Sequence, residues 1–173
     1  MIEGGKGGNK TLTGLDFEKR IDLREVFNKI KDYSLEGNDL LYKGKIVAKF
    51  YKKNNLYLFL KQYKINWKER ISKRLLPDET IFVLTNQTLF ILEMKFQKVA
   101  GSVDEKLQTC DFKKKQYQKL FSGAGIKIEY CYILSDWFMH ESYKDTLNYI
   151  NSVGCKYFFE TLPFEFLGLP EPN

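Results

Sequence analysis

Short apolar runs bounded by turn-forming residues recur along this chain and predict β-strands. Residues 81–84 (IFVL) and 89–92 (LFIL) are rich in β-favouring side chains, and the intervening TNQT favours a hairpin. Residues 45–52 (KIVAKFYK) alternate as in a half-buried strand, and residues 126–134 (IKIEYCYIL) predict a further core strand. The sequence therefore predicts a sheet in which the hairpin is central.

Segments with helical periodicity separate and flank these strands. Capping-box patterns begin two of them, at Thr13 and at Ser102. The segment after Asn55 repeats apolar residues at helical spacing, but it is short enough that a strand remains the alternative. The predicted helices span about 15–31, 56–63, 67–74, 102–121 and 142–153, with a short edge strand at about 156–160. We expect one domain over residues 1–173, with a glycine-rich leader at 1–14.

The second hairpin strand changes from apolar to charged at residues 93–95 (EMK), inside the run FILEMKF. Asp78 follows Pro77 at the start of the first hairpin strand, with fourteen residues between it and Glu93. A surface Asp and an ordinary Glu–Lys pair at a strand end would give the same letters. Burial of an unpaired charge costs roughly several kcal/mol. A charged pair within an apolar strand is therefore more typical of a functional site than of a purely structural strand.

The hairpin geometry predicts which of these side chains lie together. If residues 86–87 form a two-residue turn, Thr80 lies opposite Glu93 and Asp78 lies opposite Lys95. Side chains alternate between faces, so Asp78, Glu93 and Lys95 would share one face. Directly opposed residues are about 5 Å apart and diagonal ones about 7–8 Å, which allows two carboxylates to bind one cation.

These residue types are typical of metal-assisted hydrolysis. Mg²⁺ takes oxygen ligands and keeps several waters, so two carboxylates and a substrate phosphate suit it. Lys95 beside such a metal would orient or deprotonate the attacking water, or stabilise negative charge on phosphorus. Gln97 is in phase with Glu93 and Lys95 and is a further catalytic candidate. Glu18 in the first predicted helix is either a solvated first-turn residue or an auxiliary acid at the metal site.

The chain carries 28 Lys and Arg against 22 Asp and Glu, a net charge of +6, which favours a polyanionic partner. Basic residues in the leader, in residues 67–74 and in the predicted helix at 102–121 are candidates for phosphate contact, although each group could instead be a solvated face or a flexible leader. The DNA-binding candidates are Lys6, Lys10, Lys68, Arg70, Lys73, Arg74, Lys98, Ser102, Lys113 and Lys114.

Other features of the composition exclude several classes of protein. A single histidine, His140, argues against zinc hydrolases, Ser-His-Asp triads and nucleases with His-bound metals. Three widely spaced cysteines favour reduced thiols in a cytoplasmic protein. No apolar stretch approaches the roughly 18 residues of a membrane span, and we expect no signal peptide and no membrane partner.

The motif Pro77-Asp78, fourteen residues, Glu93-Met94-Lys95 resembles that of the PD-(D/E)XK nuclease superfamily. The segments GGNKTLTGLDFE, FQKVAGSVDEKLQT and YILSDWF with VGCKYFF also look like those of small type II restriction endonucleases. The resemblance implies an α/β fold with a central mixed sheet flanked by helices (an αβββαβ core) and Mg²⁺-dependent DNA hydrolysis, with Mn²⁺ able to substitute. It also implies Asp78 and Glu93 as metal ligands, Lys95 as the water-orienting group, and Glu18 as an auxiliary acid. A companion DNA methyltransferase is a further implied partner.

From the sequence we therefore expect a restriction endonuclease that cuts double-stranded DNA at a specific sequence. Symmetric duplex targets suit a two-fold protein, so a homodimer is expected. Two alternatives remain open at this point: a structure-specific nuclease of the Holliday-junction resolvase or repair type, and a basic DNA-binding module without catalysis.

Overall fold

The computed structural model describes residues 11–12, 22–97 and 103–172. Five candidate site residues lie outside these ranges, and their roles stay predictions: Lys6, Lys10, Glu18, Lys98 and Ser102.

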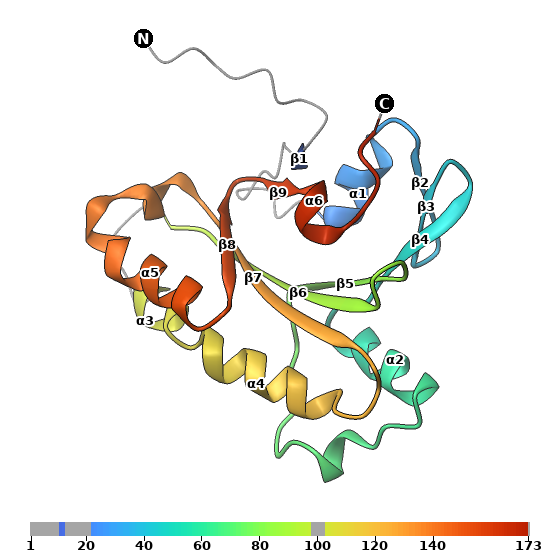
Figure 1. Cartoon of the computed structure of the whole chain (residues 1–173), viewed down its shortest axis with the longest axis horizontal. Helices are drawn as coiled ribbons and strands as arrows, with labels where there is room; N and C mark the ends of the chain where they lie inside the picture. The colour runs from blue at the N-terminus through green and yellow to red at the C-terminus, as the bar shows by residue number, and fades with distance from the viewer. Residues whose placement is uncertain (1–10, 13–21, 98–102, 173) are drawn as a thin grey trace.

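A seven-stranded mixed sheet runs through the protein in the order β2-β3-β4-β5-β6-β7-β8 (Figure 1). Neighbouring strands from β2 to β6 are antiparallel, whereas β6, β7 and β8 are parallel to one another. The predicted α/β fold with a mixed sheet flanked by helices is confirmed. The strands are β2 (Tyr33–Glu36), β3 (Asp39–Tyr42), β4 (Lys45–Phe50), β5 (Glu79–Val83), β6 (Thr88–Lys95), β7 (Lys127–Leu134) and β8 (Lys156–Phe159).

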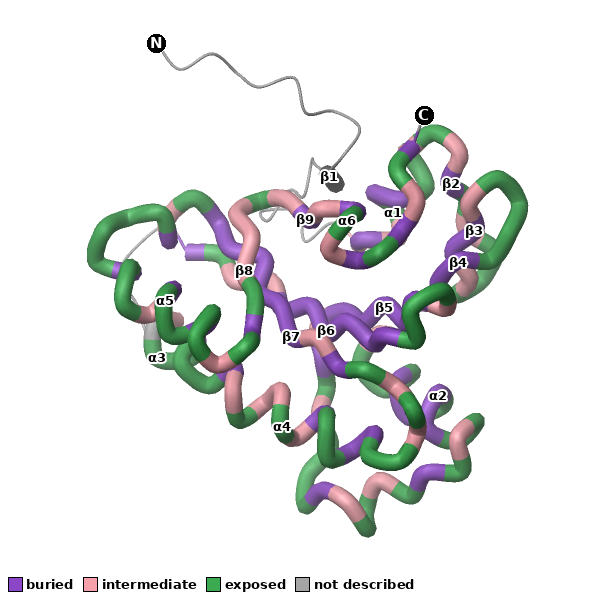
Figure 2. Tube along the Cα trace, viewed as in Figure 1, coloured by how far each residue is buried: buried purple, intermediate pink, exposed green. Residues whose placement is uncertain are grey.

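Helices cover both faces of the sheet, and the buried central strands lie between them (Figures 1 and 2). One apolar cluster joins the sheet to α1 (Leu23–Asn28) and α6 (Phe164–Leu167). The other joins it to four helices on the opposite face. These are α2 (Leu56–Gln62), α3 (Val103–Leu107), α4 (Cys110–Leu120) and α5 (Lys144–Ser152). No helix in the described ranges is long and apolar enough to cross a membrane.

The hairpin of β5 and β6 has a different register from the one predicted. Thr80 pairs with Ile91, not with Glu93, so the pairing is displaced by two residues. The loop comprises the four residues 84–87 rather than a two-residue turn. Two features of Gln87 favour this longer loop: its backbone is left-handed (φ 51°), and its side chain donates to Leu84 O at 2.8 Å. Asn86 also donates to Leu167 O at 3.0 Å and ties the loop to α6.

A displacement by two residues leaves every side chain on its predicted face, because side chains alternate with a period of two. Phe82, Leu89 and Ile91 accordingly pack in the cluster beneath α4, and Ile81 and Phe90 pack in the cluster beneath α1. The predicted face was therefore right, although the predicted pairs were wrong.

Several helix boundaries also differ from prediction. The first helix was expected over 15–31; residues 15–21 lie outside the described ranges, and the described helix α1 ends at Asn28, with the Asp22 side chain accepting from the Arg24 N–H at 3.0 Å at its start. The helix predicted from Ser102 to Phe121 is broken between α3 and α4 at 108–109. The helix predicted at 67–74 is only a 3₁₀ turn, η2 (Trp67–Glu69), which the Asn66 side chain caps. For the segment predicted at 56–63, the helix rather than the alternative strand is confirmed: it forms α2.

The sequence patterns did not reveal β2 and β3, because each has four residues and the polar positions do not alternate cleanly. The glycines in the turns after these strands were the signal that the sequence offered for them. Gly37 and Gly44 take left-handed backbones (φ 59° and 76°), which glycine adopts without strain. Two residues of the predicted leader, β1 (Thr11–Leu12), pair antiparallel with β9 (Leu162–Pro163).

The start of β5 is held on the α1 side by a buried charge pair. Glu79 is 3 % exposed, and its Oε1 accepts from Lys52 Nζ at 2.6 Å. Lys52 Nζ also lies 3.7 Å from Asp22 Oδ2 at the start of α1. The backbone continues the pairing beside them, because the Tyr51 N–H donates to Thr80 O at 3.0 Å. Lys52 therefore joins α1, the end of β4 and the first residue of β5.

We expect Lys52→Met to lower the free energy of unfolding by about 1–3 kcal/mol, because Glu79 would stay buried without its counter-charge. The loss is smaller than for a fully enclosed pair, since the Lys52 side chain is 43 % exposed. Urea unfolding measures it, and Lys52→Met combined with Glu79→Leu should recover stability. The control is Lys144→Met, whose partner Glu141 is in water; equal losses for the two single variants would contradict the role of Lys52.

Candidate active site

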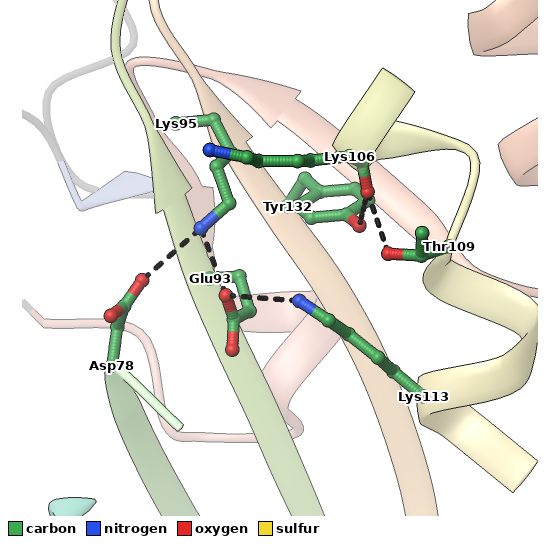
Figure 3. Close-up of polar contacts among 7 residues, drawn as sticks. All are labelled: Asp78, Glu93, Lys95, Lys106, Thr109, Lys113 and Tyr132. Carbon is green, nitrogen blue, oxygen red and sulfur yellow. Dashed lines mark hydrogen bonds and ion pairs between the residues drawn. The ribbon is translucent and has the colours of Figure 1, made fainter. Parts of the chain in front are cut away.

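Glu93 occupies the point in β6 where the sheet changes from apolar to polar. Residues 88–92 are buried on both faces, whereas 94 and 95 are partly exposed. The β5 strand begins only at Glu79, which pairs with Leu92, so no β5 residue pairs with Glu93. On the β7 side, Glu93 pairs with Tyr132. Asp78, in the bend before β5, lies across from Glu93 in place of a strand residue (Figure 3).

The three motif residues meet as the sequence predicted. Lys95 Nζ lies 2.8 Å from Glu93 Oε2 and 3.4 Å from Asp78 Oδ2, so one ammonium group bridges both carboxylates (Figure 3). Glu93 is 8 % exposed, whereas the Asp78 side chain is 48 % exposed. The group is therefore anchored in the sheet at Glu93 and open to solvent at Asp78.

Lys95 is held in its charged form. Burial by itself lowers the pKa of the Lys95 ammonium, but the charge and hydrogen bond of Glu93, followed by those of Asp78, outweigh burial and raise the pKa above its usual value. In this arrangement Lys95 is a hydrogen-bond donor and a positive charge, and it has no lone pair with which to accept a proton.

A second lysine reaches Glu93 from the helical layer. Lys113, in the first turn of α4, has its Nζ 3.7 Å from Glu93 Oε2. The break between α3 and α4 places this turn over the sheet, and the Lys106 carbonyl freed there accepts from Thr109 Oγ1 at 2.7 Å and Tyr132 Oη at 3.2 Å (Figure 3). The polar residues at the break therefore direct Lys113 toward Glu93.

Buried tyrosines form the apolar surroundings of Glu93. Tyr117 of α4 and Tyr130 of β7 are almost fully buried, and burial is the main cause that raises the pKa of each phenol. The negative charge of Glu93 raises both pKa values further. These phenols stay neutral and limit the access of water to Glu93 from below, which strengthens the electrostatic interactions at the carboxylate.

The donor set fits a hard divalent cation. Two carboxylates converge on one positive nitrogen, and exposure on the Asp78 side leaves room for water and a phosphate oxygen, which Mg²⁺ and Mn²⁺ accept as ligands. Across the described ranges no three His, Cys, Asp or Glu side chains gather as a metal site, so a cation bound here would have two protein ligands, Asp78 and Glu93.

Gln97 is close to Glu93 and Lys95 in the sequence, but its contacts in the structure differ from theirs. It is buried, and its N–H donates to Ser135 Oγ at 3.3 Å at the ends of β6 and β7. Neither polar atom of its side-chain amide has a hydrogen-bond partner within the part of the chain that the structure describes. The structure does not bring Gln97 into contact with Asp78, Glu93 or Lys95, and its catalytic role stays a prediction.

Besides Lys113, three more of the predicted DNA-binding residues already have partners in the protein. Arg70 donates to Leu120 O and Ser122 Oγ, both at 3.2 Å, and holds the end of α4. The Arg74 guanidinium lies over the rings of Tyr57 and Trp67 at 4.7 and 5.2 Å.

Lys114 is similarly engaged, because it pairs with Glu129 at 3.3 Å and donates to Gly154 O at 2.6 Å. Arg70, Arg74 and Lys114 therefore have contacts within the protein, and their DNA-binding roles stay predictions. Lys68 and Lys73 have exposed side chains and stay DNA-binding candidates.

Comparisons with protein-family models, with curated proteins and with solved structures found no match. The interpretation of this site therefore rests on its own chemistry and on the motif.

We expect Arg70→Ala to lower the free energy of unfolding by about 1–2 kcal/mol, because the carbonyl at the end of α4 loses a charged donor. The matched control is Lys73→Ala, which should change stability by less than about 0.5 kcal/mol because its side chain is exposed. Urea unfolding checks both variants. A stable Arg70→Ala protein with weakened DNA binding would support the original prediction for this residue.

Proposed function

We propose that this protein is a Mg²⁺-dependent endonuclease of the PD-(D/E)XK type that hydrolyses phosphodiester bonds of double-stranded DNA at a specific sequence. One observation carries the proposal: Asp78, in the bend before β5, and Glu93, in the adjacent strand β6, converge on a single positive charge. A DNA-binding module without catalysis has no need of a carboxylate in the middle of its sheet, because such burial costs free energy.

The chemistry follows from these side chains. In hydrolysis, the oxygen of water forms a bond to phosphorus and loses a proton, while the bond from phosphorus to the leaving sugar oxygen breaks and that oxygen gains a proton. Asp78 and Glu93 would hold Mg²⁺, which supplies Lewis-acid activation when bound. Lys95, as an ammonium donor, would orient the water and stabilise negative charge on the phosphate oxygens.

The net positive charge of the chain and its exposed lysines support DNA as the substrate. The net charge of +6 favours a polyanion, and Lys68 and Lys73 are exposed on the segment that precedes Asp78 in the chain. Restriction at symmetric sites would require a homodimer, and protection of the host DNA would require a companion methyltransferase. The restriction role therefore predicts two partners in addition to DNA.

Digestion of a long plasmid and of phage DNA tests the proposal directly. With Mg²⁺ or Mn²⁺ we expect discrete fragments with uniform ends, and with EDTA we expect none. Cutting that requires branched DNA would replace the restriction role with a structure-specific nuclease. A mobility shift without cleavage under any metal would reduce the function to DNA binding.

Substitutions test the site itself. We expect Asp78→Ala, Glu93→Ala and Lys95→Ala each to lower the cleavage rate by at least about a hundredfold, because the first two variants lose a metal ligand and the third loses the positive donor to the phosphate. Unfolding experiments should show that each variant still folds. Glu141→Ala is the control, since this carboxylate is 84 % exposed on an exposed 3₁₀ turn, and it should cleave normally. Near-normal cleavage by any of the three variants would refute the assignment.

A further inference from the structure

The position of Lys113 is unusual among the lysines of α4. Lys115 pairs with Asp111 within the helix at 2.7 Å, and Lys114 holds β7 through Glu129. Lys113 instead extends to Glu93, a carboxylate that already has Lys95 at 2.8 Å. Its own side chain remains 34 % exposed, so the ammonium lies at the boundary between Glu93 and solvent.

The charges of this group balance without any ligand. Two carboxylates, Asp78 and Glu93, face two ammonium groups, Lys95 and Lys113, so the four side chains sum to zero. Without Lys113 the group would carry one net negative charge, which would repel a phosphate. A buried ion pair of Glu93 with Lys95 alone would already satisfy Glu93, so stability does not require the second lysine.

We infer that Lys113 is a second active-site cation, which contacts the phosphate at the point of cleavage rather than the DNA backbone in general. The inference rests on the proposed nuclease function. With a divalent cation bound, the group carries two net positive charges. Two positive charges balance the transition state, because the diester contributes one negative charge and the deprotonated water contributes a second.

The inference predicts opposite effects on two measurements. Lys113→Ala should bind Mn²⁺ about three- to tenfold more tightly in calorimetry without DNA, because a unit charge is removed from a half-exposed site a few ångströms away. The same variant should cleave saturating DNA about a hundredfold more slowly, because the transition state loses a positive donor. Lys113→Arg keeps the charge and should leave Mn²⁺ affinity at the wild-type value.

A lysine that only tethers DNA behaves differently. It would lower the slope of log affinity against log salt by about 0.9 without changing Mn²⁺ affinity. Lys119→Ala, exposed on the same helix, is the matched control and should leave Mn²⁺ affinity unchanged. Unchanged Mn²⁺ affinity together with normal cleavage at saturating DNA for Lys113→Ala would overturn the inference.

The same experiment separates this inference from the proposed function. If wild-type protein binds Mn²⁺, loses it in Glu93→Ala and cleaves DNA, but Lys113→Ala matches wild type, only the role of Lys113 fails. If wild-type protein binds no Mn²⁺, or Glu93→Ala binds it equally well, the metal site itself fails and the inference fails with it.

Discussion

The compensation of a buried carboxylate is the constraint on which the rest of this site depends. Glu93 lies in β6, an interior strand of the sheet, near neutral phenols, where an unpaired negative charge would cost roughly several kcal/mol. Lys95 supplies the first counter-charge from the same strand and the same face, and the exposed Asp78 shares that ammonium. The result is a pair of carboxylates around one positive charge, which is the arrangement that a divalent cation would also favour.

Asp78 can take part only because the start of β5 is fixed from the other side of the sheet. Its neighbour Glu79 points toward α1 and pairs with Lys52, which also approaches Asp22. Adjacent acidic residues thus lie on opposite faces, each near its own lysine. The pair of Glu79 with Lys52 holds the strand, and Asp78 next to it remains partly exposed beside Lys95.

The interruption between α3 and α4 is the second element that shapes the site. A continuous helix would satisfy the Lys106 carbonyl internally and would set a different direction for the next turn. Instead, Thr109 and Tyr132 satisfy that carbonyl, and Lys113 approaches Glu93 from above the sheet. Local hydrogen bonding therefore determines which of several consecutive lysines reaches the acidic pair.

The sequence by itself determined that Glu93 and Lys95 share a face, because side chains alternate along a single strand. Asp78 joins them because the observed pairing is displaced by two residues, whereas a displacement by one would have moved it to the other face. The sequence also determined the central strands, whose apolar patterns are strong, but it left a strand as the alternative to α2. The tertiary structure decided the pairing of β5 with β6, since Asn86 and Gln87 form contacts within the loop and with α6 that spacing does not encode.

It also decided which cations are available. Arg70, Arg74, Lys113 and Lys114 look alike in the sequence, but each has a different partner: a carbonyl for Arg70, aromatic rings for Arg74, Glu93 for Lys113 and Glu129 for Lys114. Charge is a local property of the sequence, whereas its compensation depends on contacts that exist only after folding.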